Sequence, residues 1–108
     1  MKLEEFKKKA ELTKDNEVYR IYDYKMERIT LSITELKPHQ ETRGHDHSGV
    51  EEVYYFLKGK GKMQIEKKII DVEEGDIVPI PDGKFHKVFN PSDKELKFFC
   101  IFEKYERE

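Results

Sequence analysis

The sequence predicts an all-β protein, a sandwich or barrel of short antiparallel strands. Between Val18 and Phe102, apolar and polar residues alternate with a period of two in several short runs. Turn-forming glycine, proline, asparagine and aspartate separate these runs at intervals of roughly 8 to 12 residues, and little of the chain shows a helical pattern. Strands of this kind bury one face against a partner sheet, so a layered β structure is expected.

Length and composition limit the possible classes of protein. A chain of 108 residues is the size of one domain, and we interpret residues 1–108 as a single domain. Charged residues make up 41% of the chain but leave a net charge of only −2, so we expect no nucleic-acid partner. The abundance of lysine and glutamate is typical of thermophile proteins. A single cysteine, a charged N-terminus and the lack of a long apolar run predict a cytoplasmic protein without a membrane partner.

The first third of the chain is expected to contain one helical segment and two strands. Apolar residues at near-helical intervals in residues 2–13 predict a short amphipathic helix or an ordered arm, which places an N-terminal arm at residues 1–16. Residues 18–22 are a candidate strand. Residues 29–34 alternate isoleucine and leucine with threonine and serine, the pattern of a half-buried antiparallel strand. Pro38 ends this region in a turn.

The remaining strands are expected after residue 51. In residues 52–57, Glu52, Tyr54 and Phe56 would share one face, and the glycine-rich residues 58–61 predict a tight hairpin. The further strand candidates are residues 62–66, 69–72, 77–80, 85–89 and 96–102, and the turn Pro81-Asp82-Gly83 precedes the fourth of them.

Three histidines and a glutamate are the candidate metal ligands. His45 and His47 are one residue apart, so on a strand their imidazoles would lie on the same face, about 7 Å apart at the backbone. Glu52 follows closely and His86 lies far downstream. Three imidazoles and one carboxylate suit a divalent transition metal, and this ligand set does not choose among Mn, Fe, Ni, Co and Zn.

The same residues resemble the two sequence motifs of the cupin superfamily. The second motif is complete, with Gly75, Pro81, Gly83, His86 and Asn90 at the expected intervals. The first contains His45, His47, Glu52 and Gly59 and lacks only its opening glycine, whose place is taken by His39. The spacing to Gly59 selects Glu52 over Glu51.

This resemblance implies a small antiparallel β-barrel of the jelly-roll type over residues 17–108, with His45, His47, Glu52 and His86 holding one divalent metal. An isolated His-x-His pair would more often be two surface histidines, and some cupins have lost their metal. Asn90 is expected to be structural. His39 sits at a turn and is not expected to bind the metal, and histidine tolerates the positive φ that glycine adopts there.

Further pocket residues are candidates, each with a simpler explanation. Tyr54 could act in catalysis through its phenol or be a core tyrosine. Arg43 and Lys62 could bind an anionic substrate at the cavity mouth or be surface charges. Phe56 and Met63 could form the apolar walls of a substrate pocket or belong to the core. Cys100 is expected to be buried and inert.

The resemblance implies a range of functions, because the superfamily includes sugar-phosphate isomerases, dioxygenases, decarboxylases and non-catalytic binding modules. We predict a metalloenzyme that acts on a small oxygenated molecule by Lewis-acid chemistry or oxygen activation. The alternative is a metal-dependent module that binds or senses a small, sugar-like ligand. A homodimer is also expected, with the stretch before Tyr24 as the contact.

Overall fold

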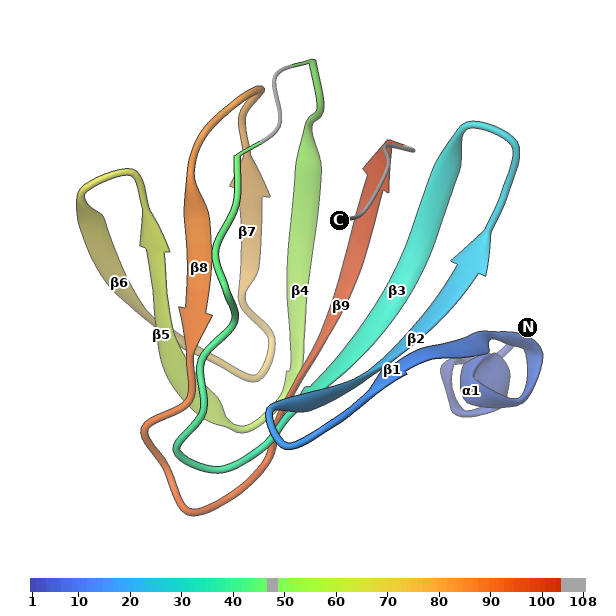
Figure 1. Ribbon diagram of the computed structural model, residues 1–108, viewed down its shortest axis with the longest axis horizontal. Helices are drawn as coiled ribbons and strands as arrows, with labels where there is room; N and C mark the ends of the chain where they lie inside the picture. The colour runs from blue at the N-terminus through green and yellow to red at the C-terminus, as the bar shows by residue number, and fades with distance from the viewer. Residues whose placement is uncertain (47–48, 104–108) are drawn as a thin grey trace.

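The computed structural model describes residues 1–46 and 49–103 and contains two antiparallel sheets that face each other (Figure 1). The larger sheet has the strand order β1-β2-β3-β9-β4-β7 and the smaller sheet the order β6-β5-β8. The larger sheet comprises β1 (Glu11–Asp15), β2 (Tyr19–Lys25), β3 (Ile29–Leu36), β4 (Glu52–Lys58), β7 (Ile77–Ile80) and β9 (Leu96–Glu103). The smaller comprises β5 (Lys60–Ile65), β6 (Lys68–Glu73) and β8 (His86–Phe89).

The core lies between the two sheets and is built by the alternation of buried and exposed residues. On β4 the pattern is regular, with Glu52, Tyr54 and Phe56 buried and the residues between them facing outward, as predicted. The largest fully buried apolar side chains come from both sheets: Leu36, Phe56, Met63, Val88, Leu96 and Phe98. The all-β jelly-roll prediction is therefore confirmed. Across the described residues the arrangement is a two-sheet sandwich, without hydrogen bonding that closes the sheets into a barrel.

The N-terminal segment differs from the predicted helix over residues 2–13. A 3-10 turn (Leu3–Glu5) and a single α-helical turn, α1 (Phe6–Lys9), are followed at once by β1 (Glu11–Asp15). Phe6 is buried and packs edge-on against Phe99, with ring centroids 5.6 Å apart. The helix ends early because residues 11–15 pair with β2, an interaction that the local pattern does not reveal.

The inward face of β3 is polar. Thr30, Ser32 and Thr34 are buried between the sheets, whereas Ile33 lies on the outer face. The N-terminal segment covers the face of β3 that carries Ile33. Ile33 is the cross-strand partner of Phe99, and Phe6 packs on the ring of Phe99. Both faces of the strand are thus largely covered.

Gly59 is where the chain changes sheets, so the predicted hairpin over residues 58–61 is wrong. β4 belongs to the larger sheet and β5 to the smaller one, and the two strands are not partners. Gly59 has a φ of +97°, and a Cβ atom there would lie 2.9 Å from the carbonyl oxygen of Glu95. A residue other than glycine would be strained in conformation and in contact with backbone.

None of the helices in the described part of the chain has the length and apolar character required to cross a membrane.

Candidate metal centre

Two of the four predicted ligands meet through backbone pairing. The segment before residue 47 runs beside β8, where it is visible as the green trace next to the orange strand (Figure 1). His45 and His86 exchange two backbone hydrogen bonds, of 3.1 and 3.0 Å. Directly opposed residues in an antiparallel pair place their side chains on the same face. Their ring centroids are consequently 4.4 Å apart.

Glu52 approaches both imidazoles from the opposite sheet. It is the first residue of β4, where it pairs with Ile80 and Phe102. Its carboxylate lies 3.5 Å from His45 Nε2 through one oxygen and 3.4 Å from His86 Nε2 through the other. One ligand atom from each of the three residues lies within 4.8 Å of the other two, a spacing that suits a shared metal ion.

The tautomer of His86 is set by its second ring nitrogen. Nδ1 lies 2.9 Å from the carbonyl oxygen of Lys84, which can only accept, so Nδ1 carries a hydrogen and donates it. In the neutral ring, Nε2 then presents a lone pair toward Glu52. Nε2 is buried and has no hydrogen-bond partner in the described part of the chain. Nε2 and the Glu52 carboxylate thus lie 3.4 Å apart without hydrogen-bond geometry.

The electrostatics of this group favour a positive charge. Burial raises the pKa of the Glu52 carboxyl, but the neighbouring imidazoles of His45 and His86 outweigh burial and lower it to about 2. Burial lowers the pKa of His86, yet its contact with Glu52 and its hydrogen bond to Lys84 produce a net rise. A buried carboxylate between two imidazoles needs either a proton or a cation to offset its charge. The residues present therefore fit a divalent metal.

A cavity of about 460 Å³ opens next to this group and is large enough for a small metabolite. His45 and Glu52 belong to its lining, and so do the side chains of Tyr54, Phe98 and Cys100. The neighbouring part of the same sheet is polar, because the inward face of β3, next to β9, contributes Ser32 and Thr34. The remaining lining residues are Lys14, Tyr19, Ile21, Thr42, Arg43, Gly44, Asp46 and Phe102.

Some of the predicted pocket residues lie in this cavity. Arg43 is exposed and lines it, and Tyr54 lines it from a buried position, with its ring centroid 5.6 Å from that of His86. Cys100 is buried, as expected, and also lines the cavity. Asp46, between the two predicted histidine ligands, is exposed and also belongs to the lining.

Other predicted residues lie elsewhere. Lys62 is on the smaller sheet, outside the cavity lining, with its ammonium group 2.6 Å from Asp71. Phe56 and Met63 are fully buried in the core and are not part of the lining. His47 lies outside the described residues.

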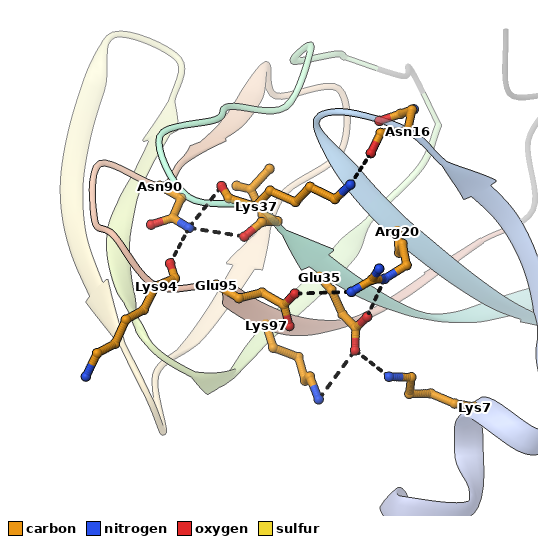
Figure 2. Close-up of polar contacts among 10 residues, drawn as sticks. Lys7, Asn16, Arg20, Glu35, Lys37, Asn90, Lys94, Glu95 and Lys97 are labelled. Carbon is orange, nitrogen blue, oxygen red and sulfur yellow. Dashed lines mark hydrogen bonds and ion pairs between the residues drawn. The ribbon is translucent and has the colours of Figure 1, made fainter.

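His39 and Asn90 follow the sequence interpretation. His39 has a φ of 61° and contacts Asp93 at the surface, away from the three clustered residues. Asn90 is buried and acts as a structural bridge, with its Nδ2 within 3.2 Å of the carbonyl oxygens of Leu36, Lys37 and Lys94 (Figure 2).

Sequence reasoning missed Lys14, Ser32, Thr34 and Thr42 as cavity residues. The alternation in residues 29–34 could have indicated a polar lining, since threonine and serine occupy one complete face of the strand. Lys14 carried no such signal, because its direction depends on an irregularity in the pairing of β1 with β2.

The chain is similar to several known proteins. The family model described as "Cupin domain" matches residues 32–102. An uncharacterized protein of Methanocaldococcus jannaschii is 32% identical over 104 residues, which cover 93% of this chain and 83% of that protein. A glucose-6-phosphate isomerase of Thermococcus litoralis is 38% identical over 68 residues, or 56% of this chain and 36% of the isomerase.

Two further comparisons extend this set. An oxalate-binding protein of Thermotoga maritima is 29% identical over 66 residues, covering 61% of this chain and 54% of that protein. Among solved structures, a Thermus thermophilus protein superposes with a TM-score of 0.80 at 23% identity and covers 95% of this chain and 97% of its own. The chain therefore spans about a third of the isomerase and about half of the oxalate-binding protein.

Proposed function

Since this chain belongs to the cupin family, we propose that it is a divalent-metal-dependent enzyme that acts on a small oxygenated molecule. In this proposal His45, His47, Glu52 and His86 hold the metal, which is one of Mn, Fe, Ni, Co or Zn. Such an ion would supply Lewis-acid polarisation of a substrate oxygen or the activation of dioxygen.

The observation that carries the proposal is the buried Nε2 atom of His86. This atom faces the Glu52 carboxylate at 3.4 Å without a hydrogen bond, and His45 approaches the same carboxylate from the cavity side. Buried polar atoms are nearly always satisfied, and an unsatisfied one is costly. A cation shared by the three residues would remove that cost.

The residues around the metal would orient its ligands, transfer protons and exclude water. The Lys84 carbonyl fixes the ring of His86 and keeps its lone pair directed at the centre. Tyr54 shares the inward face of β4 with Glu52 and lines the cavity, and in this proposal its phenol would move a proton to or from a bound molecule. The buried walls of Phe98 and Phe102 would limit the access of water.

Within the enzyme class, we favour an isomerase acting on a sugar phosphate. The likeness to glucose-6-phosphate isomerases supports this choice, and so does the position of Arg43 in the cavity lining. The Ser32 and Thr34 hydroxyls, which line the cavity from β3, are suited to a polyhydroxylated substrate. Because this chain matches only part of the isomerase, the substrate is part of the proposal and not a consequence of the likeness.

The second candidate is a non-catalytic module that binds a small ligand through the same metal. The likeness to an oxalate-binding protein favours it. In this case the metal and the cavity would hold a ligand without converting it.

One experiment separates the two candidates. The protein is purified without added metal, its metal content is measured, and each candidate metal is then added before a screen of sugar phosphates and small carboxylates. Saturable turnover that is lost in His45→Ala supports the enzyme. Binding without turnover under all metals supports the module.

His39→Asn is the matched control for this experiment. It also removes a histidine, but one at the surface, and asparagine tolerates the positive φ at this position. A protein that binds no metal and gains no thermal protection from any divalent ion would contradict both candidates.

A further inference from the structure

Lys14 points into the cavity because of a bulge in β1. Leu12 pairs with Tyr22, but the next paired residue is Lys14, opposite Ile21, so Thr13 is extra. Without this insertion Lys14 would pair with Arg20, on the outer face of the sheet. Because directly opposed residues share a face, the bulge brings Lys14 to the side of Ile21, and both residues line the cavity.

The bulge is held in place by Thr13. Its hydroxyl lies 3.0 Å from a carboxylate oxygen of the buried Asp23 and 3.3 Å from the carbonyl oxygen of Ile21. The side of the sheet from which Lys14 projects is therefore set by the folded hairpin.

Arg43 reaches the same cavity from the segment that precedes His45. Among residues 1–46 and 49–103, neither Lys14 nor Arg43 forms an ion pair with a carboxylate. Six other cations in the described residues do form ion pairs: Lys7, Arg20, Lys62, Lys84, Lys87 and Lys97. Two cations from separate segments thus face one cavity without a compensating charge of their own.

The acidic residues of the cavity do not cancel this charge once a metal is present. Asp46 and Glu52 are the carboxylates in the lining, and each supplies one negative charge. With a divalent ion at the centre, the positive charges exceed the negative ones by two. A ligand with one or two negative charges would complete the balance.

We propose that Lys14 and Arg43 form an anion-binding site at the cavity, which holds the phosphate or carboxylate group of the ligand whose oxygen atoms approach the metal centre. This inference rests on the proposed function and makes it more specific, because it excludes neutral sugars as the main ligands. The guanidinium of Arg43 can bind two oxygens of such a group at once, and the ammonium of Lys14 adds a second charge-assisted contact.

The test measures binding of four probes to the metal-loaded protein by calorimetry: glucose 6-phosphate, inorganic phosphate, oxalate and neutral glucose. Anionic probes are expected to bind, with an affinity that falls as salt is added, and glucose is expected to bind far more weakly. The tighter of glucose 6-phosphate and oxalate identifies the anionic group as phosphate or carboxylate.

Lys14→Gln and Arg43→Gln are each expected to weaken binding of the best anionic probe about tenfold, the effect of losing one charge-assisted hydrogen bond. Lys14→Arg should retain most of the affinity. Lys62→Gln is the matched control, since it removes a lysine charge outside the cavity.

Two results would overturn the inference: glucose binding as tightly as glucose 6-phosphate, or Lys14→Gln binding anions no more weakly than Lys62→Gln. Metal content measured on the same samples separates this inference from the proposed function. If the protein binds no metal but anion binding still requires Lys14, the proposed function fails and the anion site stands. If metal binds normally and Lys14→Gln has no effect, only the anion site fails.

Discussion

At the residue scale, the candidate metal centre depends on the imidazole of His86, whose orientation is fixed by a hydrogen bond on the side away from the metal site. His86 donates from Nδ1 to the Lys84 carbonyl and turns Nε2 toward Glu52. A carbonyl behind a ligating histidine raises its basicity and fixes its orientation. His86 is therefore better held than His45, which is half-buried at the cavity.

We expect His86→Ala to abolish the thermal protection given by divalent metals. The wild-type melting temperature should rise with added metal, because an ion that binds only the folded state stabilises it. The variant loses a ligand from the most rigid part of the centre, and its affinity should fall at least 100-fold. Thermal shift with and without metal measures this, with His39→Asn as control. An equal metal-dependent shift in His86→Ala would show that the ion binds elsewhere.

Asn90 has a structural role, which is to link two turns by hydrogen bonds. It is 1% exposed, and its amide links the turn after β3 to the turn before β9 (Figure 2). Its oxygen also accepts hydrogen bonds from the backbone and the hydroxyl of Ser92.

Asn90→Ala should destabilise the protein by about 2 to 3 kcal/mol, because one buried and several partly buried backbone groups lose their partner together. Urea denaturation of the metal-free protein measures the effect without interference from ion binding. Asp93→Ala in the same turn is the control, and since Asp93 is highly exposed its loss should cost less than about 0.5 kcal/mol. Equal stability of the two variants would contradict the bridging role.

At the scale of elements, the short N-terminal helix is held on the outer face of the larger sheet by a buried charge. The Glu35 carboxylate on β3 contacts Lys7 at 2.6 Å, Arg20 at 3.2 Å and Lys97 at 3.5 Å (Figure 2). Four residues of helix could not stay folded alone. This ion cluster and the packing of Phe6 keep the segment in place.

Glu35→Gln should lower the free energy of unfolding by about 1 kcal/mol at neutral pH. The carboxylate is buried, but Lys7 and Arg20 are about 40% exposed, so solvent screening reduces the contribution of each ion pair to the free energy of unfolding. Denaturation of both proteins in urea measures the difference. The control is Glu95→Gln, which removes a more exposed carboxylate whose contact with Arg20 is 3.7 Å.

The pH dependence of this cluster has a definite sign. Burial raises the pKa of Glu35, but its hydrogen bonds to Lys7 and Arg20 and the neighbouring charges lower it below 4.5 overall. A depressed pKa in the folded state means that the stabilisation is complete above pH 4.5 and is lost as the pH falls through the lower folded value. The stability gap between wild type and Glu35→Gln should therefore close under acid. A gap that does not narrow as the pH falls below 4.5 would contradict this assignment.

At the scale of the whole molecule, the outer face of the larger sheet is apolar. Cross-strand partners form two rows over four strands, which are Leu31, Ile101, Val53 and Pro79, and next to them Ile33, Phe99, Tyr55 and Ile77. Phe6 covers one end of this face, while Tyr55 is 41% and Ile77 65% exposed at the other. Contiguous apolar surface of this kind is typical of interaction sites.

The predicted homodimer stays a prediction, and this face supports a more specific form of it. The stretch before Tyr24 was expected to make the contact, but Phe6 in that stretch packs on its own sheet. We expect a second copy of the chain to cover the part of this face that is still exposed. Because neither row contains a charged residue, the same surface on two copies can pack together about a two-fold axis. Sedimentation should give twice the chain mass of 13.0 kDa, and Ile77→Lys should give the monomer. A wild-type monomer at micromolar concentration would contradict this.

The sequence by itself determined the fold family, the approximate place of the strands after β1 and the identity of three clustered residues. Strand periodicity assigns Glu52, Tyr54 and Phe56 to one face whatever lies opposite, and spacing to Gly59 distinguishes Glu52 from Glu51. These features are local, because backbone geometry fixes which residues share a face and where a chain turns.

Only the tertiary structure decided which face turns inward and which distant residues meet. The polar side of β3 faces the cavity because Phe6 and Phe99 cover the other side. Lys14 reaches the cavity through a bulge that exists only in the pairing of β1 with β2, whereas Lys62 is carried away because the chain changes sheets at Gly59. His45 meets His86 through a pairing across 41 positions of the chain. Such contacts depend on which strands become neighbours, and the free energy that selects neighbours comes from burial over the whole molecule and not from any short stretch of it.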